Sequence, residues 1–76
     1  MTTDEDILGR ISRLVDEEHQ LENQPDGADA DRLRALEIQL DQCWDLLRQR
    51  RARRDAGLNP DDARVRDAAT VEGYQQ

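Results

Sequence analysis

The chain has 76 residues, of which 18 are acidic and 11 are basic, so its formal net charge at neutral pH is −7. Only fifteen residues are Leu, Ile or Val and none is Phe, a composition close to that of disordered chains. These values exclude a second domain and a large core, and the lack of any apolar run near about 18 residues excludes a membrane-spanning segment.

The first predicted helix covers about residues 4–22. Its main apolar line recurs at steps of four, three and seven and consists of Ile7, Ile11, Leu14 and Leu21. Such steps place side chains on one face of a helix. Leu8 and Val15 form a second apolar line beside the first. Thr3 precedes an acidic first turn at 4–6, which suits a helix N-terminus.

The second predicted helix covers about residues 30–56. Residues 23–27 separate it from the first helix, because Pro25 and Gly27 favour a turn. Its apolar line steps by three and four, and consists of Leu33, Leu36, Leu40, Cys43 and Leu47, with Trp44 beside it. Gly57 follows an arginine-rich last turn and is placed as the C-cap. Residues 1–57 are therefore predicted to form a helical hairpin.

Residues 58–76 form a C-terminal tail. Asn59 and Pro60 are typical of a cap and a first helical position, so a short helix is expected after them. Val65, Val71 and Tyr74 are too sparse to define an apolar face. Two alternatives stay open: the tail docks on the hairpin as a short helix, or it remains mobile.

Apolar spacing and charge select the same antiparallel register. If Leu21 faces Leu33, then residues whose numbers sum to 54 face one another, and Asp4 meets Arg50 near the other end of the hairpin. Glu22 would then lie near Arg32. Residues 1–22 carry a net charge of −5 and residues 32–57 carry +3, so an acidic helix faces a basic one.

Apolar burial within one hairpin is small, which predicts self-association. Two isolated helices bury too little apolar surface to offset the entropy of ordering them. The line formed by Leu8, Val15 and Trp44 lies on one flank of the hairpin and would be covered by a second copy. We therefore expect an all-α, coiled-coil-like hairpin that dimerises into a four-helix bundle, with these three residues as the dimer or partner interface.

The arginine-rich run is the strongest local feature, and its candidate anion contacts are Arg48, Arg50, Arg51, Arg53 and Arg54. One interpretation is phosphate contact in a nucleic-acid-associated accessory protein. Against it stand the net charge of −7, the presence of only two aromatic residues, and a helical spacing that spreads the arginines around the helix. A salt-bridged helix end is the preferred interpretation, with Arg53 and Arg54 as the best contacts for an external partner.

Nothing in the sequence supports catalysis, a cofactor or a metal. Cys43 lies on the predicted seam, where it acts as a small apolar side chain, and His19 falls on the outer face of the first helix near the opposite end. One cysteine and one histidine cannot assemble a metal site. The single cysteine and the acidic N-terminal segment favour a cytoplasmic setting.

Several segments resemble those of a small actinobacterial family of unknown function. They are LDQCWDLLRQRRARRDAG at 40–57, NPDDARVR and VEGY after it, and DEDILGRISRLVDEEHQLE at 4–22. The resemblance covers nearly the whole chain, and the loop at 23–31 departs from it most. It implies a short cytoplasmic helical protein and carries over no catalytic residue or ligand.

The sequence thus predicts a non-enzymatic, self-associating helical interaction or adaptor module without a cofactor. A homodimer is expected, an unidentified protein partner is compatible with the same surface, and neither nucleic acid nor a membrane is expected as a partner. The alternative is the nucleic-acid-associated protein that uses the arginines at 48–54.

Overall fold

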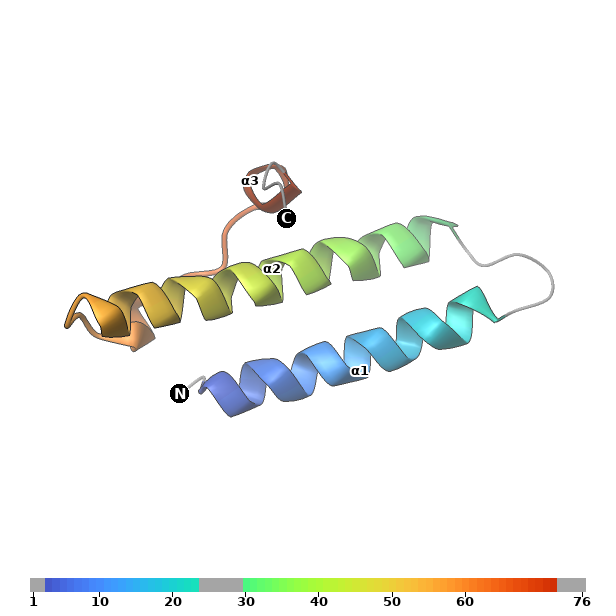
Figure 1. Cartoon of the computed structure of the whole chain (residues 1–76). Coiled ribbons are helices and arrows are strands. Elements are labelled where there is room, and N and C mark those ends of the chain that lie inside the picture. The colour runs from blue at the N-terminus through green and yellow to red at the C-terminus, as the bar shows by residue number, and fades with distance from the viewer. Residues whose placement is uncertain (1–2, 24–29, 73–76) are drawn as a thin grey trace.

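The computed structural model describes residues 3–23 and 30–72. Helix α1 spans Asp4–Glu22 and helix α2 spans Ala30–Asp55; a 3-10 helix, η1, follows at Pro60–Asp62, and a short helix, α3, at Ala68–Glu72 (Figure 1). Every regular element within the described ranges is helical. The bounds of α1 coincide with the predicted range, and α2 ends one residue earlier than expected.

Helix α1 begins at a reciprocal cap formed by Thr3 and Asp6. The Thr3 hydroxyl accepts a hydrogen bond from the Asp6 amide at 3.2 Å, and the Asp6 carboxylate accepts one from the Thr3 amide at 3.1 Å. Two amides that the helix itself leaves without acceptors are satisfied in this way. The hydrogen bonds from Thr3 also hold the pKa of Asp6 below its ordinary value.

Helix α2 ends in a Schellman motif at Gly57, the residue that the sequence places at its C-terminal end. Gly57 has a φ of 75°, a left-handed conformation that glycine adopts without a steric penalty. The amide of Leu58 donates to the carbonyl of Arg53 at 2.8 Å, and the amide of Gly57 donates to that of Arg54 at 3.1 Å. The chain therefore turns back sharply along α2.

The core lies along the seam between α1 and α2, which run antiparallel (Figure 1). Its buried members are Ile7, Ile11, Leu14, Leu36 and Cys43. Half-buried apolar side chains close the seam, among them Val15, Leu40 and Leu47. Leu46 also packs against the core, from one flank.

The tail docks on α2, on the side away from α1, so that α2 lies between α1 and α3 (Figure 1). Val71 of α3 is almost fully buried there. Residues 58–72 therefore adopt the docked arrangement in this structure, with α3 as the short helix, while Tyr74 lies outside the described residues. In the part of the chain that the structure describes, no helix is long and apolar enough to cross a membrane.

Candidate functional site

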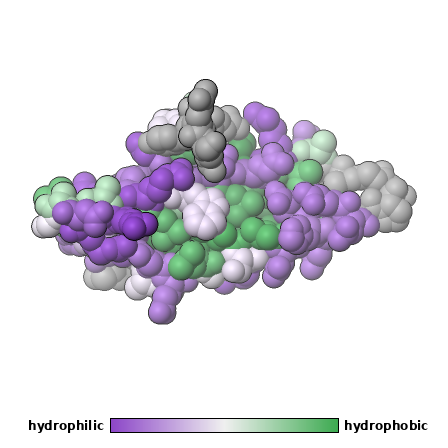
Figure 2. All heavy atoms as spheres, viewed as in Figure 1, coloured by the Kyte–Doolittle hydropathy of each residue, from purple (hydrophilic) through white to green (hydrophobic). Residues whose placement is uncertain are grey.

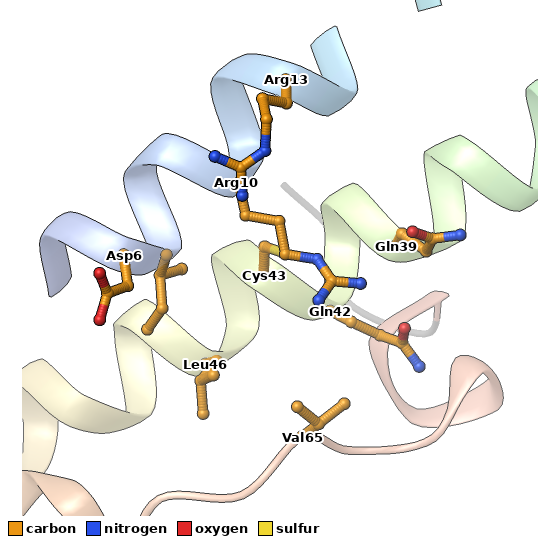
Figure 3. A pocket seen from close by; sticks show the side chains of 9 residues that line it. Asp6, Arg10, Arg13, Gln39, Gln42, Cys43, Leu46 and Val65 are labelled. Atoms are coloured by element: carbon orange, nitrogen blue, oxygen red, sulfur yellow. The ribbon is translucent and has the colours of Figure 1, made fainter. Parts of the chain in front are cut away.

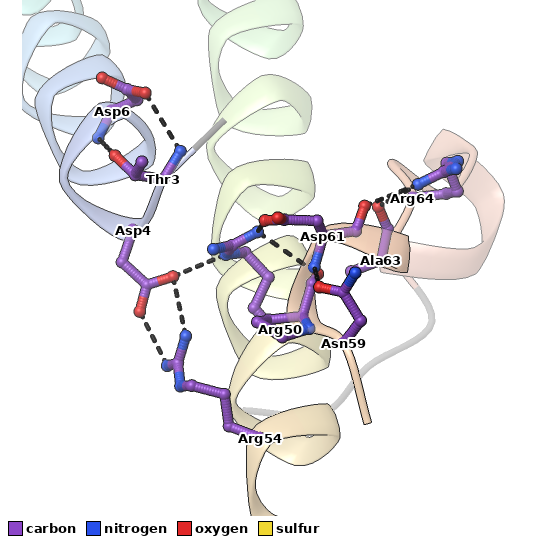
Figure 4. Close-up of polar contacts among 10 residues, drawn as sticks. Thr3, Asp4, Asp6, Arg50, Arg54, Asn59, Asp61, Ala63 and Arg64 are labelled. Atoms are coloured by element: carbon purple, nitrogen blue, oxygen red, sulfur yellow. Dashed lines mark hydrogen bonds and ion pairs between the residues drawn. The ribbon is translucent and has the colours of Figure 1, made fainter. Parts of the chain in front are cut away.

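An ionic cluster joins the open ends of the two long helices (Figure 4). The Arg50 Nε atom lies 2.6 Å from Oδ1 of Asp4, which confirms the predicted pairing of these two residues. Arg54 adds two hydrogen bonds to the same carboxylate, at 2.8 and 3.2 Å. The hydrogen bonds from Arg54 and Arg50 hold the pKa of Asp4 below its ordinary value of 3.8. Asp4 is thus held as an anion by two guanidinium groups.

The buried guanidinium of Arg50 also binds the tail. Its Nη1 atom lies 3.0 Å from the Asp61 carboxylate and 3.3 Å from the Pro60 carbonyl, both in η1. Its partners Asp4 and Asp61 raise the pKa of Arg50 above its ordinary value. One side chain of α2 therefore links the start of α1 to the first turn of the tail.

These contacts correct the expectation that Arg50 and Arg54 are available to an anion or partner outside the hairpin. Arg50 is buried and engaged on both sides, so it is not available to an external anion. Arg54 was expected to project toward an external partner, but it binds Asp4. Arg48 and Arg51 lie at the surface and Arg53 is half-buried, so the run presents no single basic face.

At the other end of the hairpin, Arg32 was expected near Glu22. The structure shows an ion pair between Arg32 and the carboxylate of Glu17. Glu17 lies more than one turn before Glu22 on α1. The ion pair is half-exposed and therefore stabilises the hairpin by no more than about 1 kcal/mol.

Asp45 is a buried charged residue that the sequence does not reveal. Its side chain is completely buried on the face of α2 that the tail covers, where it accepts hydrogen bonds from Arg66 and Gln49. The Arg66 bond is the largest influence, and it holds the pKa of Asp45 below its ordinary value despite burial. In the sequence, nothing distinguishes Asp45 from the other acidic residues of the chain.

Two glutamines of α2 bind the backbone of the tail beside Asp45. Gln49 donates from Nε2 to the Arg64 carbonyl at 2.7 Å, and its Oε1 atom accepts from the Arg64 amide at 3.4 Å. Gln42 donates to the Arg66 carbonyl at 3.1 Å. Gln42, Asp45 and Gln49 recur at steps of three and four, a polar stripe that is the only sequence signal for this contact.

The predicted interface residues lie on one flank of the hairpin. Leu8 and Trp44 remain 47% and 42% exposed, and Val15 is half-buried against the core. In Figure 2, apolar residues gather in the middle of the face along which α1 and α2 lie side by side, with hydrophilic residues on either side of them. The structure therefore shows an apolar surface that includes two of the three predicted residues in exposed positions.

The opposite flank holds a groove of about 340 Å³, which Figure 3 shows from close by. From α1, the residues that line it precede core residues by one position: Asp6, Arg10 and Arg13. From α2 it is lined by Gln39, Gln42, Cys43 and Leu46, and from the tail by Val65. Leu8 and Val15 instead follow core residues by one position, so helical geometry places them on the other flank.

Cys43 and His19 stand apart from each other, as the sequence indicates. Burial raises the pKa of the Cys43 thiol, and the positive charge of Arg10 opposes this only in part, so the thiol stays protonated at neutral pH. His19 is exposed on α1. No group of three or more histidine, cysteine or acidic side chains suited to a metal ion occurs among the residues that the structure describes.

Comparisons with known proteins identify relatives of this chain along nearly its full length. Residues 3–76 match the model of a family described as "Protein of unknown function (DUF2630)". Uncharacterised proteins of Mycobacterium tuberculosis and Mycobacterium bovis are each 49% identical over 78 residues, which cover 95% of this chain and 90% of the relative. No solved structure matches the chain.

Proposed function

The chain belongs to the DUF2630 family, whose function is unknown, and we propose that it is a non-enzymatic module that works by self-association. In this proposal two hairpins pair through the flank that carries Leu8, Val15 and Trp44, and together form a four-helix bundle. The dimer would then serve as an interaction or adaptor unit. A cytoplasmic setting is part of the proposal and rests on the single cysteine.

The observation that carries the proposal is the exposure of Leu8 and Trp44 beside a thin core. The tail covers a different side of α2, so among the described residues this flank has no cover from the chain itself. A large aromatic side chain that is 42% exposed next to apolar neighbours is typical of an interface anchor. Pairing of two hairpins would bury it.

Charge favours a second copy as the occupant of this flank. Residues 1–22 carry a net charge of −5, whereas residues 32–57 carry +3. A two-fold axis that sets α1 of one copy beside α2 of the other brings opposite charges together on both sides of the apolar strip. A neutral or uniformly acidic partner would lack this match.

The nucleic-acid alternative is not carried forward. Two of its five arginines, Arg50 and Arg54, already bind Asp4, and Arg50 is buried. Phosphate contact by these two side chains would require the ionic cluster to open. The described residues therefore favour the interpretation of a salt-bridged helix end.

The experiment that tests self-association is measurement of molar mass by light scattering for the wild type and Trp44→Glu. We expect a wild-type dimer and a monomeric variant with reduced helicity, because a carboxylate on the apolar flank would be buried without a partner. Leu58→Glu is the matched control, since Leu58 is exposed but lies beyond the end of α2. It should remain dimeric. A monomeric wild type, or a dimeric Trp44→Glu variant, would contradict the proposal.

A further inference from the structure

The groove opposite the apolar flank is lined by both charged and apolar side chains. Arg10 and Arg13 enter it from α1, with Arg10 extending across toward Gln42, and the apolar side chains of Leu46 and Val65 line it from α2 and the tail (Figure 3). A second, more open hollow continues from it past Arg10 and Arg13 toward Arg32. The volume of about 340 Å³ lies within the range of small-ligand sites, roughly 300–1,000 Å³.

The guanidinium groups of Arg10 and Arg13 outnumber the one carboxylate that lines this groove, that of Asp6. Within the described part of the chain, Arg10 and Arg13 make no hydrogen bond or ion pair. By contrast, Asp6 accepts from the Thr3 amide, and Glu17 of the adjoining hollow accepts from Arg32. Arg10 and Arg13 are the only arginines of α1, a strongly acidic helix without lysine, and both line the groove. An anion in the groove would therefore meet two unpaired guanidinium groups.

The apolar half of the groove is incompletely covered. Ile7 and Cys43 form its floor and are buried, while Leu46 is half-buried. Val65, which the docked tail holds over the groove, is 61% exposed. Gln49 and Gln42 fix the tail backbone on both sides of Val65, so its position over the groove is built into the fold. An apolar chain placed between Leu46 and Val65 would cover this surface.

We propose that this groove binds a small amphipathic carboxylate, such as a medium-chain fatty acid. The carboxylate would accept hydrogen bonds from Arg10 and Arg13, since guanidinium groups present paired donors that match its two oxygens. Gln39, on the α2 side of the same groove, would supply a further amide donor. The alkyl chain would lie along Leu46 and Val65, away from the two arginines.

The test is a titration of the full-length isotope-labelled chain with octanoate below its micelle concentration, followed by NMR. We expect saturable shifts of the methyl signals of Leu46 and Val65 and of the side-chain Nε–H signals of Arg10 and Arg13. Octylammonium, with the same chain and the opposite charge, should leave these signals unchanged. Acetate, which lacks the chain, should bind at least tenfold more weakly, because the alkyl chain would no longer be buried.

The double variant Arg10→Gln, Arg13→Gln should bind octanoate at least about tenfold more weakly than the wild type, because two charge-assisted hydrogen bonds are lost. Arg48→Gln, Arg51→Gln is the matched control, since it removes the same charge outside the groove. Equal binding by the groove variant, shifts caused equally by octylammonium, or acetate or inorganic phosphate binding as tightly as octanoate would each overturn the proposal.

This inference is independent of self-association. The groove and the apolar flank lie on opposite sides of the hairpin, so the arginine double variant should keep the wild-type molar mass. Likewise, Trp44→Glu changes the apolar flank and none of the residues that line the groove. Failure of octanoate to bind would therefore leave the dimer unaffected, and a monomeric wild type would leave the groove in place.

Discussion

The carboxylate of Asp45 on α2 is completely buried against the guanidinium of Arg66 in the tail, with 2.9 Å between Arg66 Nε and one carboxylate oxygen. The two partners differ in exposure, because the Arg66 side chain remains 39% exposed. Removal of either partner breaks the same ion pair. If Asp45 is removed, the remaining guanidinium of Arg66 is partly exposed to water. If Arg66 is removed, the remaining carboxylate of Asp45 is buried.

Arg66→Ala should therefore destabilise the fold more than Asp45→Ala does. The arginine substitution leaves a buried carboxylate that keeps the hydrogen bond from Gln49 but loses its ion pair, and should lower the free energy of unfolding by about 2–4 kcal/mol. The aspartate substitution leaves a guanidinium that water can solvate, so we expect a loss nearer 1–2 kcal/mol. Urea unfolding at one protein concentration measures both. Equal losses would contradict the burial of Asp45.

Stability should fall in acid because of Asp45 and Asp4. Arg66 lowers the pKa of Asp45, and Arg54 and Arg50 lower that of Asp4, both from an ordinary 3.8. A lowered folded pKa means that the unfolded chain binds more protons, so both groups stabilise the fold above about pH 4 and lose this effect as the pH falls through their folded values.

The corresponding measurement is the urea midpoint as a function of pH. We expect no change from these two groups above about pH 5 and a steep fall below about pH 4. Asp4→Asn should start from a lower midpoint and lose less of it on acidification, because it lacks one of the two groups. The same acid loss in Asp4→Asn as in the wild type would show that Asp4 does not contribute.

The hairpin could be predicted because two independent patterns selected one register. Apolar spacing alone set Ile11 against Cys43, and charge alone set Asp4 against Arg50. For the tail, the sequence leaves docking and mobility open, because part of what holds the tail is a set of hydrogen bonds from the α2 glutamines to the backbone carbonyls of Arg64 and Arg66. Every residue carries such a carbonyl, so the sequence of the tail does not indicate which of its residues accept these hydrogen bonds.

The two candidate surfaces, the apolar flank and the groove, also differ in how far the sequence predicts them. The flank with Leu8 and Trp44 follows from helical periodicity, and the sequence finds it. The groove needs Val65 to be placed over Leu46 by the tail, and therefore appears only in the folded chain. Arg10 and Arg13 are visible in the sequence as the two arginines of an acidic helix. That they belong to a groove is evident only from the structure, which places Leu46 and Val65 in the same lining.

Two neighbouring arginines of the arginine-rich run, Arg50 and Arg51, should differ in their effect on stability. Arg50 is buried between Asp4 and Asp61, so Arg50→Ala should lower the free energy of unfolding by about 2–3 kcal/mol. Arg51 is the exposed neighbour, and Arg51→Ala should change stability by no more than about 0.5 kcal/mol. Thermal unfolding followed by circular dichroism compares the two. A large loss in Arg51→Ala would indicate that the run has another structural partner.

Gly57 and Gly9 should respond to alanine in opposite directions. Gly57 has a φ of 75° and open space where a Cβ atom would lie, so Gly57→Ala would add only backbone strain, about 1 kcal/mol. Gly9 lies inside α1, where an added Cβ atom would meet Arg13 Nη1 at an ordinary 3.8 Å. Alanine is a better helix former there by about 0.5–1 kcal/mol. Urea unfolding should therefore show a destabilised Gly57→Ala and a stabilised Gly9→Ala, whereas a stabilised Gly57→Ala would contradict the Schellman end of α2.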